Sequence, residues 1–390
     1  MRICSTVAEY NPLHTGHLRH IEYMKYTLGA EKLIVIMSGN FTQRGEPAVL
    51  DKFTRAKQAV IAGADVVIEL PTVFATANAE IFATGAVNVL NALGVAEGLC
   101  FGVESGDRDS YLSLASAMNN ESKEFKKLLK ANLEKGESLA KAKFEAVKML
   151  GNRDLDESLI SSPNNILGLE YTKALMKAKS RIEIFPMTRE GDHNDLSLKK
   201  GLTSAASIRR IIKTGRLGKL KKCMPRYVYK DIKGYPFAFD KITMSALLTA
   251  SVESMSELPD CTEGLENRIK ALSKDNRTVD ELVERVSTRR YTSTRIRRIL
   301  TANLLGIKKR FTDDCLGAGT YAKVLAARSD CKALLSEICE KSSVPVLIRK
   351  SDAAMLKKTA AECFELDVLA NDLYNLATGG NNNENYTVFV

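Results

Sequence analysis

The order of short apolar runs in the first third of the chain constrains the fold most strongly. Four such runs lie at Ile3–Ala8, Lys32–Ser38, 65–70 and Gly98–Val103. Helical patterns separate them at 18–28, Lys52–Ala62 and 78–93. Short apolar strands that alternate with helices are typical of a parallel sheet covered on both faces. We therefore predict an α/β, Rossmann-like sheet, which binds its ligand at the carboxyl ends of the strands.

The remaining sequence predicts one more strand of this sheet and then a mostly helical C-terminal part. An inserted helical stretch is expected at about 107–160, a fifth strand at 181–187 and a helix at 204–214. The pattern breaks at 225–236, and the sequence beyond it is mostly helical in character. We expect a first domain at 1–224, built on this sheet and its inserted helices, and a mostly helical C-terminal domain at 225–390.

Positive charge is concentrated in two blocks. The chain has 57 Lys and Arg against 47 Asp and Glu. Residues 199–240 hold twelve basic and two acidic residues, and 285–310 hold nine basic residues and no acid. Two basic blocks on an otherwise acidic chain favour a polyanionic partner, although charge clusters are also common on solvated helix faces.

The sequence predicts neither a membrane protein nor a disulfide or zinc scaffold. No run of about 18 apolar residues is present, and no charged-then-apolar leader follows Met1. The eight cysteines are scattered and form no CxxC pair. We expect a cytoplasmic protein with reduced thiols and no obligatory protein partner.

Three of the four histidines lie together, directly after the first strand, in AEYNPLHTGHLRH. His14, Gly16 and His17 form an HxGH pattern where a helix is expected to begin. Helix N-termini bind phosphates, Gly16 leaves room for close approach, and two imidazoles can donate to charge on a phosphorus centre. A polar helix start or a metal site is the alternative, but a zinc site would need a fourth ligand. The segment therefore indicates a nucleotide site with His14 and His17 as its catalytic residues.

A second helix start carries hydroxyl groups and a basic residue. Ser204 and Ser207 lie near the start of the helix that follows the fifth strand, and Arg209 follows them. These three residues are predicted to form a second phosphate clamp. An ordinary N-cap on a basic surface helix is the alternative.

The two segments resemble the nucleotidyltransferase α/β-phosphodiesterase superfamily, which cleaves a nucleoside triphosphate at the α-phosphate. More narrowly, the chain resembles the tRNA(Met) cytidine acetate ligase family. The resemblance rests on AEYNPLHTGHLRH, MSGNFTQRGEPAVLDKFTRAKQAVIAGADVVIELP, FGVES and SSPNNILGLEY. It covers about the first 210 residues and, more loosely, YTSTRIRRIL near the second basic block.

This resemblance implies a two-step reaction. ATP and acetate give acetyl-adenylate and pyrophosphate, and the acetyl group then passes to N4 of the wobble cytidine of elongator tRNA(Met) with loss of AMP. Mg²⁺ is expected to bridge the phosphates, with no protein ligand assigned. A small-molecule adenylyltransferase is the alternative, but it leaves the second basic block and the long C-terminal part without a role.

The resemblance also implies an ATP site. Its members are the loop residues Val7, Ala8, Glu9, Tyr10, Asn11, Pro12, Leu13, His14, Thr15, Gly16, His17, Leu18, Arg19 and His20, together with Gly102, Asn165 and Arg189. Spacing alone leaves Asn164 as an alternative to Asn165. For acetate or cytidine, the candidates are Arg44, Asp51, Lys52 and Arg55, which could equally belong to a surface loop and helix.

The basic residues supply the candidates for tRNA. They are Arg216, Lys219, Lys221 and Lys222 near the catalytic part, and Arg289, Arg290, Arg295, Arg297 and Arg298 in the C-terminal part. Lys and Arg contacts to phosphates would give salt-dependent affinity. Tyr291 is either a stacking platform for an unpaired base or a half-buried helix-start aromatic.

Overall fold

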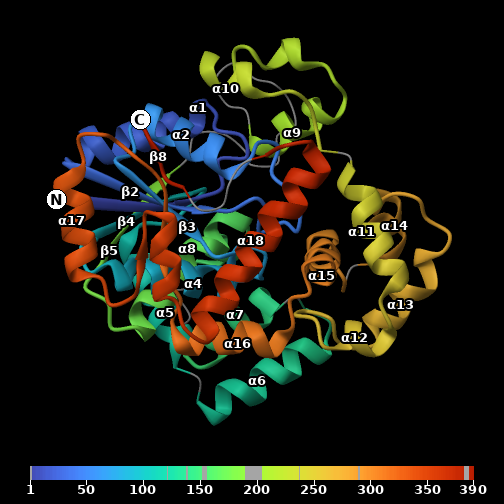
Figure 1. Cartoon of the computed structure of the whole chain (residues 1–390). Coiled ribbons are helices and arrows are strands. Elements are labelled where there is room, and N and C mark those ends of the chain that lie inside the picture. Colours follow the sequence, from blue (N-terminus) through green and yellow to red (C-terminus); the bar gives the residue numbers. More distant parts are fainter. Residues whose placement is uncertain are drawn as a thin grey trace.

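An eight-stranded, mostly parallel sheet organises the protein (Figure 1). The computed structural model describes residues 2–120, 122–137, 139–151, 156–188, 204–236, 238–288, 290–381 and 386–390. The strands are β1 (Ile3–Ala8), β2 (Lys32–Ser38), β3 (Val66–Leu70), β4 (Gly98–Val103), β5 (Glu183–Thr188), β6 (Ala322–Ala327), β7 (Val346–Leu347) and β8 (Val388–Phe389). The predicted α/β class and its five N-terminal strands are confirmed, with shifts of only one or two residues at their ends.

The strand order places a binding crevice beside β1. The sheet runs β5-β4-β1-β2-β3-β6-β7, and β8 pairs with β6. The chain goes from β1 outward through β2 and β3, and then returns to add β4 and β5 on the other side of β1. Such a switch point leaves a crevice at the carboxyl ends of the strands, which here are those of β1 and β4.

Side-chain alternation along the strands builds two apolar cores. On β2, Ile34 and Ile36 enter the core on one face, while Leu33, Val35 and Met37 enter the core on the other. Because successive strand residues point to opposite faces, a continuously apolar run is buried on both sides. The two cores fix the sheet rigidly beneath the crevice.

Helices cover both faces of the sheet and form a further group beside it (Figure 1). They are α1 (Thr15–Glu22), a π-helical turn η1 (Tyr23–Thr27), α2 (Lys52–Ala62), α3 (Thr72–Ala75), α4 (Ala79–Leu93), α5 (Arg108–Asn119), α6 (Lys123–Glu134), α7 (Leu139–Met149), η2 (Glu157–Ile160), α8 (Pro163–Lys177), α9 (Ala205–Lys213), η3 (Leu217–Leu220), α10 (Arg226–Asp231), α11 (Ala238–Thr249), α12 (Val252–Ser256), α13 (Leu265–Ser273), α14 (Val279–Val286), α15 (Ser293–Leu305), α16 (Lys309–Ala318), α17 (Lys332–Lys341), η4 (Lys350–Met355) and α18 (Thr359–Thr378). Within the described residues, no helix combines the length and the apolar character needed to cross a membrane.

The last part of the chain returns to the sheet, which differs from the predicted division at residue 225. β6 pairs antiparallel with β3, and β8 pairs with β6. The α18 side chains Asp367 and Tyr374 bond to the backbone of Thr72 and Ala48. The expected helical character holds for the helices from α11 to α16, but the strands and helices from β6 onward complete the N-terminal fold.

Candidate nucleotide site

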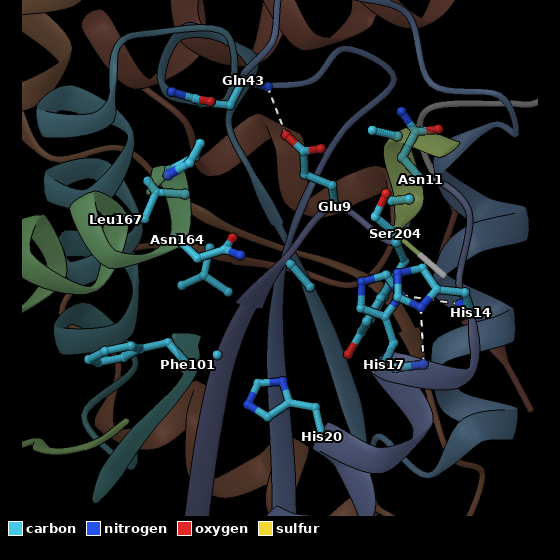
Figure 2. A pocket seen from close by; sticks show the side chains of 18 of the residues that line it. Glu9, Asn11, His14, His17, His20, Gln43, Phe101, Asn164, Leu167 and Ser204 are labelled. Atoms are coloured by element: carbon cyan, nitrogen blue, oxygen red, sulfur yellow. Dashed lines mark hydrogen bonds between the residues drawn. The ribbon is translucent and has the colours of Figure 1, made fainter. Parts of the chain in front are cut away.

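A pocket of about 550 Å³ opens at the carboxyl ends of the central strands (Figure 2). Its floor includes Ala8 at the end of β1, Phe101 and Gly102 on β4, and Met187 and Thr188 on β5. This is the position that the strand order predicts for a ligand. The predicted Gly102 thus lies in the pocket lining, where its lack of a side chain exposes the backbone.

The two motif histidines form a mutual cap at the start of α1. Gly16 N–H donates to His14 Nδ1 at 3.0 Å, and His14 N–H donates to His17 Nδ1 at 3.2 Å. Their rings stack with centroids 3.8 Å apart. Because each Nδ1 accepts a hydrogen bond, each neutral ring carries its proton on Nε2. The cap therefore fixes two histidine N–H donors with known orientation in the pocket wall.

The sequence suggests that Gly16 leaves room for a phosphate, but in the structure its Cα lies against the His14 ring. A Cβ at this position would lie 2.8 Å from His14 Cε1 and 3.1 Å from its Nδ1. A side chain would thus push away the His14 ring that caps the helix. Gly16 lines the pocket as predicted, and its main structural effect is to let His14 fold back over the helix start.

Among the described helices, α1, α8 and α9 begin at the pocket. α1 is capped by His14, α8 by Ser162 and α9 by Ser204. Pro163 and Asn164 at the start of α8, and Ala205 and Ala206 at the start of α9, line the pocket. The positive ends of three helix dipoles favour an anionic ligand. The pocket is therefore electrostatically suited to a polyphosphate.

Most of the predicted ATP loop reaches the pocket. Within 7–20, the residues that line it are Val7, Ala8, Glu9, Tyr10, Asn11, His14, Gly16, His17, Arg19 and His20. Pro12 and Leu13 are buried beneath the loop, and Thr15 and Leu18 lie outside the lining. Burial raises the pKa of the Tyr10 phenol, which stays neutral and packs its ring edge-on against His17 at 5.0 Å. The predicted Arg189 lies outside the described residues.

Asn164 and Asn165 have separate positions. Asn164 lines the pocket and donates through Nδ2 to Glu104 Oε1 at 2.6 Å. Asn165 is buried, accepts from Glu104 N–H at 2.8 Å and donates to Ser105 Oγ and the Ser158 carbonyl. The structure therefore brings Asn164 to the ligand space, while Asn165 ties the loop after β4 to α8 behind it.

Of the three residues predicted to form a second phosphate clamp, two line the pocket and one does not. Ser204 caps α9 by accepting from Ser207 N–H at 3.2 Å, and the Ser207 hydroxyl donates to the Ser204 carbonyl at 2.8 Å. Ser204 and Arg209 line the pocket, whereas Ser207 is buried within the cap. Arg209 Nη1 donates to the Asn11 carbonyl at 2.9 Å, which joins the two predicted phosphate segments.

Lys52 and Arg55 do not reach the ligand space, contrary to their proposed contact with acetate or cytidine. Lys52 is buried and pairs with Glu69 at 2.7 Å. The buried Arg55 donates to the carbonyls of Leu50, Glu9, Ser38 and Gly39. Charged groups this deep are stable only when paired or fully hydrogen-bonded. Asp51 caps α2 through Thr54 N–H, and Arg44 lines the pocket.

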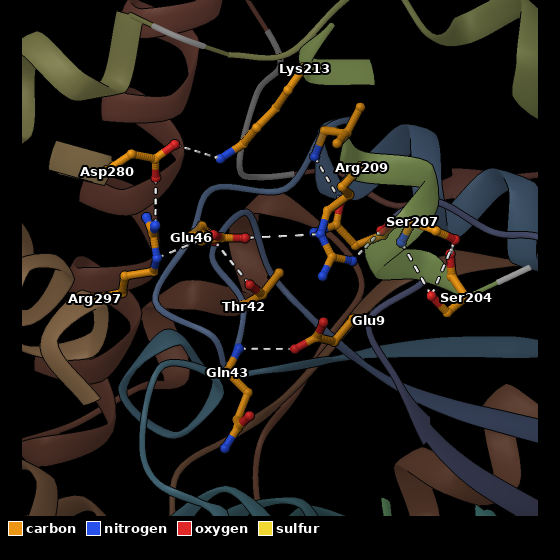
Figure 3. Close-up of polar contacts among 12 residues, drawn as sticks. Glu9, Thr42, Gln43, Glu46, Ser204, Ser207, Arg209, Lys213, Asp280 and Arg297 are labelled. Atoms are coloured by element: carbon orange, nitrogen blue, oxygen red, sulfur yellow. Dashed lines mark hydrogen bonds and ion pairs between the residues drawn. The ribbon is translucent and has the colours of Figure 1, made fainter. Parts of the chain in front are cut away.

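A chain of ion pairs joins the pocket wall to the C-terminal helices (Figure 3). Glu46 lies between Arg209 and Arg297, with nitrogen–oxygen distances of 3.9 and 3.5 Å. Arg297 also pairs with Asp280 at 2.5 Å, and Asp280 pairs with Lys213 at 3.2 Å. α9, α14, α15 and the loop after β2 are thereby held together at the rim of the pocket.

The arginines of the second basic block are largely occupied by protein partners. The side chains of Arg297 and Arg298 are only 16% and 13% exposed, and Arg298 pairs with Asp260 at 2.9 Å. Arg295 bonds to the Asp260 carbonyl and to Thr262, and Arg290 pairs with Glu263 while remaining exposed. Arg297 and Arg298, which the sequence predicts to contact tRNA, therefore hold the helices together in this structure and present little side-chain surface. Arg289 lies outside the described residues.

Most of the described basic side chains of the first block, in contrast, are exposed to solvent. Arg216, Lys219, Lys221 and Lys222 are all exposed, as are Arg210, Arg226, Lys230 and Lys233. They cover the segment from α9 to α10, which packs beside the pocket through the Thr15 N–H bond to the Cys223 carbonyl. We call residues 204–233 the basic module. Tyr291, in contrast, is half-buried against the apolar core, in agreement with its interpretation as a helix-start aromatic.

Several pocket residues were absent from the sequence predictions. Gln43 and Glu104 follow the ends of β2 and β4, and an apolar wall is formed by Phe82, Phe101, Leu167 and Tyr171. The signal that could have found Glu104 is its position directly after a predicted parallel strand, and Gln43 lies in the loop that follows another predicted parallel strand. Among the described residues, no three His, Cys, Asp or Glu side chains gather as a metal-binding cluster.

A Rossmann-like sheet with an HxGH helix cap and converging helix N-termini defines a nucleotide-binding enzyme of the nucleotidyltransferase class. A family model described as HIGH Nucleotidyl Transferase matches residues 1–387. The chain is 38% identical over 398 residues to the tRNA(Met) cytidine acetate ligase of Acetivibrio thermocellus, covering 96% of this chain and 94% of that protein. It is 36% identical over 388 residues to the Clostridium novyi protein of the same name, covering 96% and 95%.

Solved structures agree with these sequence relatives. The fold superimposes on apo TmcAL from Thermotoga maritima with a TM-score of 0.93 at 28% identity, over 100% of both chains. The same protein bound with α-thio ATP gives a TM-score of 0.90 at 27% identity, again over 100% of both chains. The chain belongs to the HIGH nucleotidyl transferase family and, within it, to the family of tRNA(Met) cytidine acetate ligases.

Proposed function

We propose that the chain is an ATP-dependent ligase that activates acetate as acetyl-adenylate. It then transfers the acetyl group to N4 of the wobble cytidine of elongator tRNA(Met). The names of the relatives and the ATP analogue in a structural neighbour support this function. The product is N4-acetylcytidine, and the reaction belongs in the cytoplasm, where tRNA is available.

The observation that carries the proposal is the joint placement of the histidine cap and three helix N-termini around one pocket. In-line displacement at the α-phosphate needs positioning and charge stabilisation rather than an enzyme nucleophile. The Nε2–H groups of His14 and His17 and the start of α9 supply donors to the phosphates. Arg209 adds a positive charge at the same wall, and Asn164 and Gly102 are suited to the nucleoside.

Acetate and ATP repel each other, so the pocket must offset several negative charges. Helix N-termini do this without mobile side chains, and preorganised dipoles cost no rearrangement during the reaction. Arg44, at the rim, is the candidate that remains for the acetate carboxylate. We infer that Mg²⁺, which neutralises phosphate charge, is held through the triphosphate oxygens.

The acceptor tRNA would dock on the basic module. Its eight exposed Lys and Arg residues lie beside the pocket, and the carboxylate of Asp231 is the acidic group among residues 204–233. Lys221 also lies 6.0 Å from the ring centre of Tyr229. Phosphate contacts from such a surface give affinity without base specificity. The basic module is therefore a better candidate for the tRNA-binding surface than α15, whose arginines are paired with protein groups.

The test is incubation with ATP, Mg²⁺ and labelled acetate, with and without tRNA, followed by digestion of the RNA to nucleosides. Label in N4-acetylcytidine is the expected result. Acetate-dependent AMP formation without labelled RNA would refute the assigned acceptor. ATP cleavage that ignores acetate would refute acetate activation and favour a small-molecule adenylyltransferase.

A further inference from the structure

Glu9 is a negative side chain in a pocket built for anions. It lies at the exit of β1 and lines the pocket together with His14 and His17. A carboxylate near a triphosphate raises the energy of the bound nucleotide by Coulomb repulsion. Its presence therefore calls for a function other than holding phosphates.

The carboxylate is held in one orientation. Gln43 N–H donates to Glu9 Oε1 at 2.9 Å, and Arg55 Nη1 donates to the Glu9 carbonyl at 2.6 Å. Oε2 forms no hydrogen bond within the described residues. In Figure 2 the carboxylate turns toward Gln43 and away from the histidine rings. One oxygen is thus fixed by the protein, while the other is available at the Gln43 end of the pocket.

Among the described residues, Glu104 is the other carboxylate that lines the pocket, and its two oxygens are arranged differently. Its Oε1 accepts from Asn164 Nδ2 at 2.6 Å, and its Oε2 accepts from the Ser162 hydroxyl. Both oxygens of Glu104 therefore serve the start of α8. Glu9, in contrast, keeps an acceptor for a substrate donor.

The acceptor chemistry supplies that donor. The exocyclic N4 amino group of cytosine is recognised by carboxylates, which accept its N–H. Its lone pair is delocalised into the ring, so it is a weak nucleophile, and it must lose a proton as it acylates. A positioned base typically accelerates such proton transfers by about 10²–10⁴-fold.

We propose that Glu9 binds the cytidine N4 amino group and takes its proton during acetyl transfer. The N4–carbon bond forms, the bond from the acetyl carbon to the adenylate oxygen breaks, and AMP leaves with that electron pair. The N4 proton passes to Glu9 Oε2 and then to solvent. This assignment rests on the proposed function and makes Glu9 a catalytic residue of the second step alone.

The experiment separates the two steps. Acetate-dependent ATP–pyrophosphate exchange without tRNA reports adenylate formation. For transfer, acetyl-adenylate is formed on the enzyme from labelled acetate, pyrophosphatase removes pyrophosphate, and elongator tRNA(Met) transcript is added over a range of concentrations. Hydroxylamine replaces tRNA in a parallel reaction, because this strong nucleophile needs no base.

For Glu9→Gln we expect the maximal transfer rate to tRNA to fall about 10²–10⁴-fold more than acetate-dependent exchange does. Hydroxamate formation should be unchanged, and Glu9→Asp should recover part of the transfer rate. Glu104→Gln is the matched charge change in the same pocket, and its effect should be similar in both steps.

Two results would overturn the role of Glu9 while leaving the proposed function intact. One is an unchanged maximal transfer rate in Glu9→Gln, and the other is an equal loss of exchange and transfer, which would make Glu9 a nucleotide contact. Absence of acetate-dependent exchange in the unsubstituted protein would instead overturn the proposed function, and the role of Glu9 with it.

Discussion

Arg297 Nε lies 3.5 Å from Glu46 Oε1, although the two residues are far apart in the sequence. This contact attaches α15 to the loop that carries the pocket residues Gln43 and Arg44. Because Glu46 also lies near Arg209, one carboxylate links the phosphate wall to the C-terminal helices. The position of the pocket rim therefore depends on residues far from it in sequence.

Reversing the charge at Arg297 should destabilise the protein as a whole. Arg297→Glu would bring a third carboxylate against Glu46 and Asp280. Because the Asp280 side chain is 55% exposed, the loss should be smaller than the value of about 3–5 kcal/mol that is typical of a fully buried pair. We expect a lower thermal midpoint and a higher KM for ATP. Arg290→Glu is the control, since Arg290 is mostly exposed. An Arg297→Glu protein as stable as this control would contradict the structural role.

Gly45 should tolerate no side chain. Its φ is +69°, and an added Cβ would overlap the backbone of Arg297 and Arg298. Gly45→Ala must therefore move α15 or the loop, at a cost of about 1–3 kcal/mol or more. Denaturant unfolding measures this loss. Gly218→Ala, with nothing within 4 Å of the added Cβ, should change stability by less than about 0.5 kcal/mol.

The two roles of His14 can be separated by substitution. Asn at this position can still accept the Gly16 N–H, but it lacks the ring Nε2–H. We expect His14→Asn to keep the thermal midpoint within a few degrees and to lower acetate-dependent exchange by about 10²–10³-fold. His14→Ala should lose the same activity and also about 1 kcal/mol of stability. Equal exchange in His14→Asn and the unsubstituted protein would remove His14 from the chemistry.

The basic module should determine affinity for tRNA. Lys219→Glu with Lys222→Glu should weaken tRNA binding, reduce its salt dependence and leave acetate-dependent exchange intact. Lys126→Glu with Lys127→Glu makes the same charge change on α6, away from the module, and should bind nearly normally. Filter binding at several salt concentrations measures both. Equal losses in the two double variants would show a general charge effect only.

Asp367 should make stability fall with rising pH. Burial, followed by repulsion from Glu69, raises the pKa of Asp367 to about 6 from its ordinary 3.8. Between these values the folded protein holds a proton that the unfolded chain has lost. The stabilising contribution is therefore complete below about pH 4, declines until about pH 6 and is constant above that.

The magnitude is on the order of 3 kcal/mol, from the size of the shift. Asp367→Asn should remove this dependence, because an amide can still accept from Thr72 N–H and meet the Tyr321 hydroxyl. Urea unfolding at pH 4.5, 6 and 7.5 measures the difference between the two proteins. A constant difference across these pH values would show that Asp367 does not titrate.

Local sequence predicted the elements that local forces determine. Lys52–Ala62 forms a helix between its predicted bounds because Asp51 caps it and Gly63 ends it. β6 was missed because its short apolar run lies among helices and its partner β3 is far upstream. Pairing across such a separation leaves no periodic signal near the strand itself.

In the candidate site, too, features set by neighbouring residues could be predicted and features set by distant contacts could not. The HxGH segment could be predicted because its ligand chemistry lies within a few consecutive residues. The burial of Arg55 and the ion pair of Arg297 could not, since a basic residue looks the same in sequence whether it faces solvent or a distant carboxylate. Glu9 was predicted only as part of the ATP loop, because its distinctive feature is a contact with Gln43 on another loop.

The late return of the chain to the sheet affects how the protein is made. A ribosome delivers β1 to β5 and the histidine cap long before β6, α18 and β8. Until then, the edge of β3 has no strand beside it, and such edges can pair with other chains. Asp367 and Tyr374, which fix the loops after β3 and β2, arrive only with α18. A nascent chain therefore gains its complete pocket only after α18 has left the ribosome, and chains truncated before β6 should aggregate rather than act as partial enzymes.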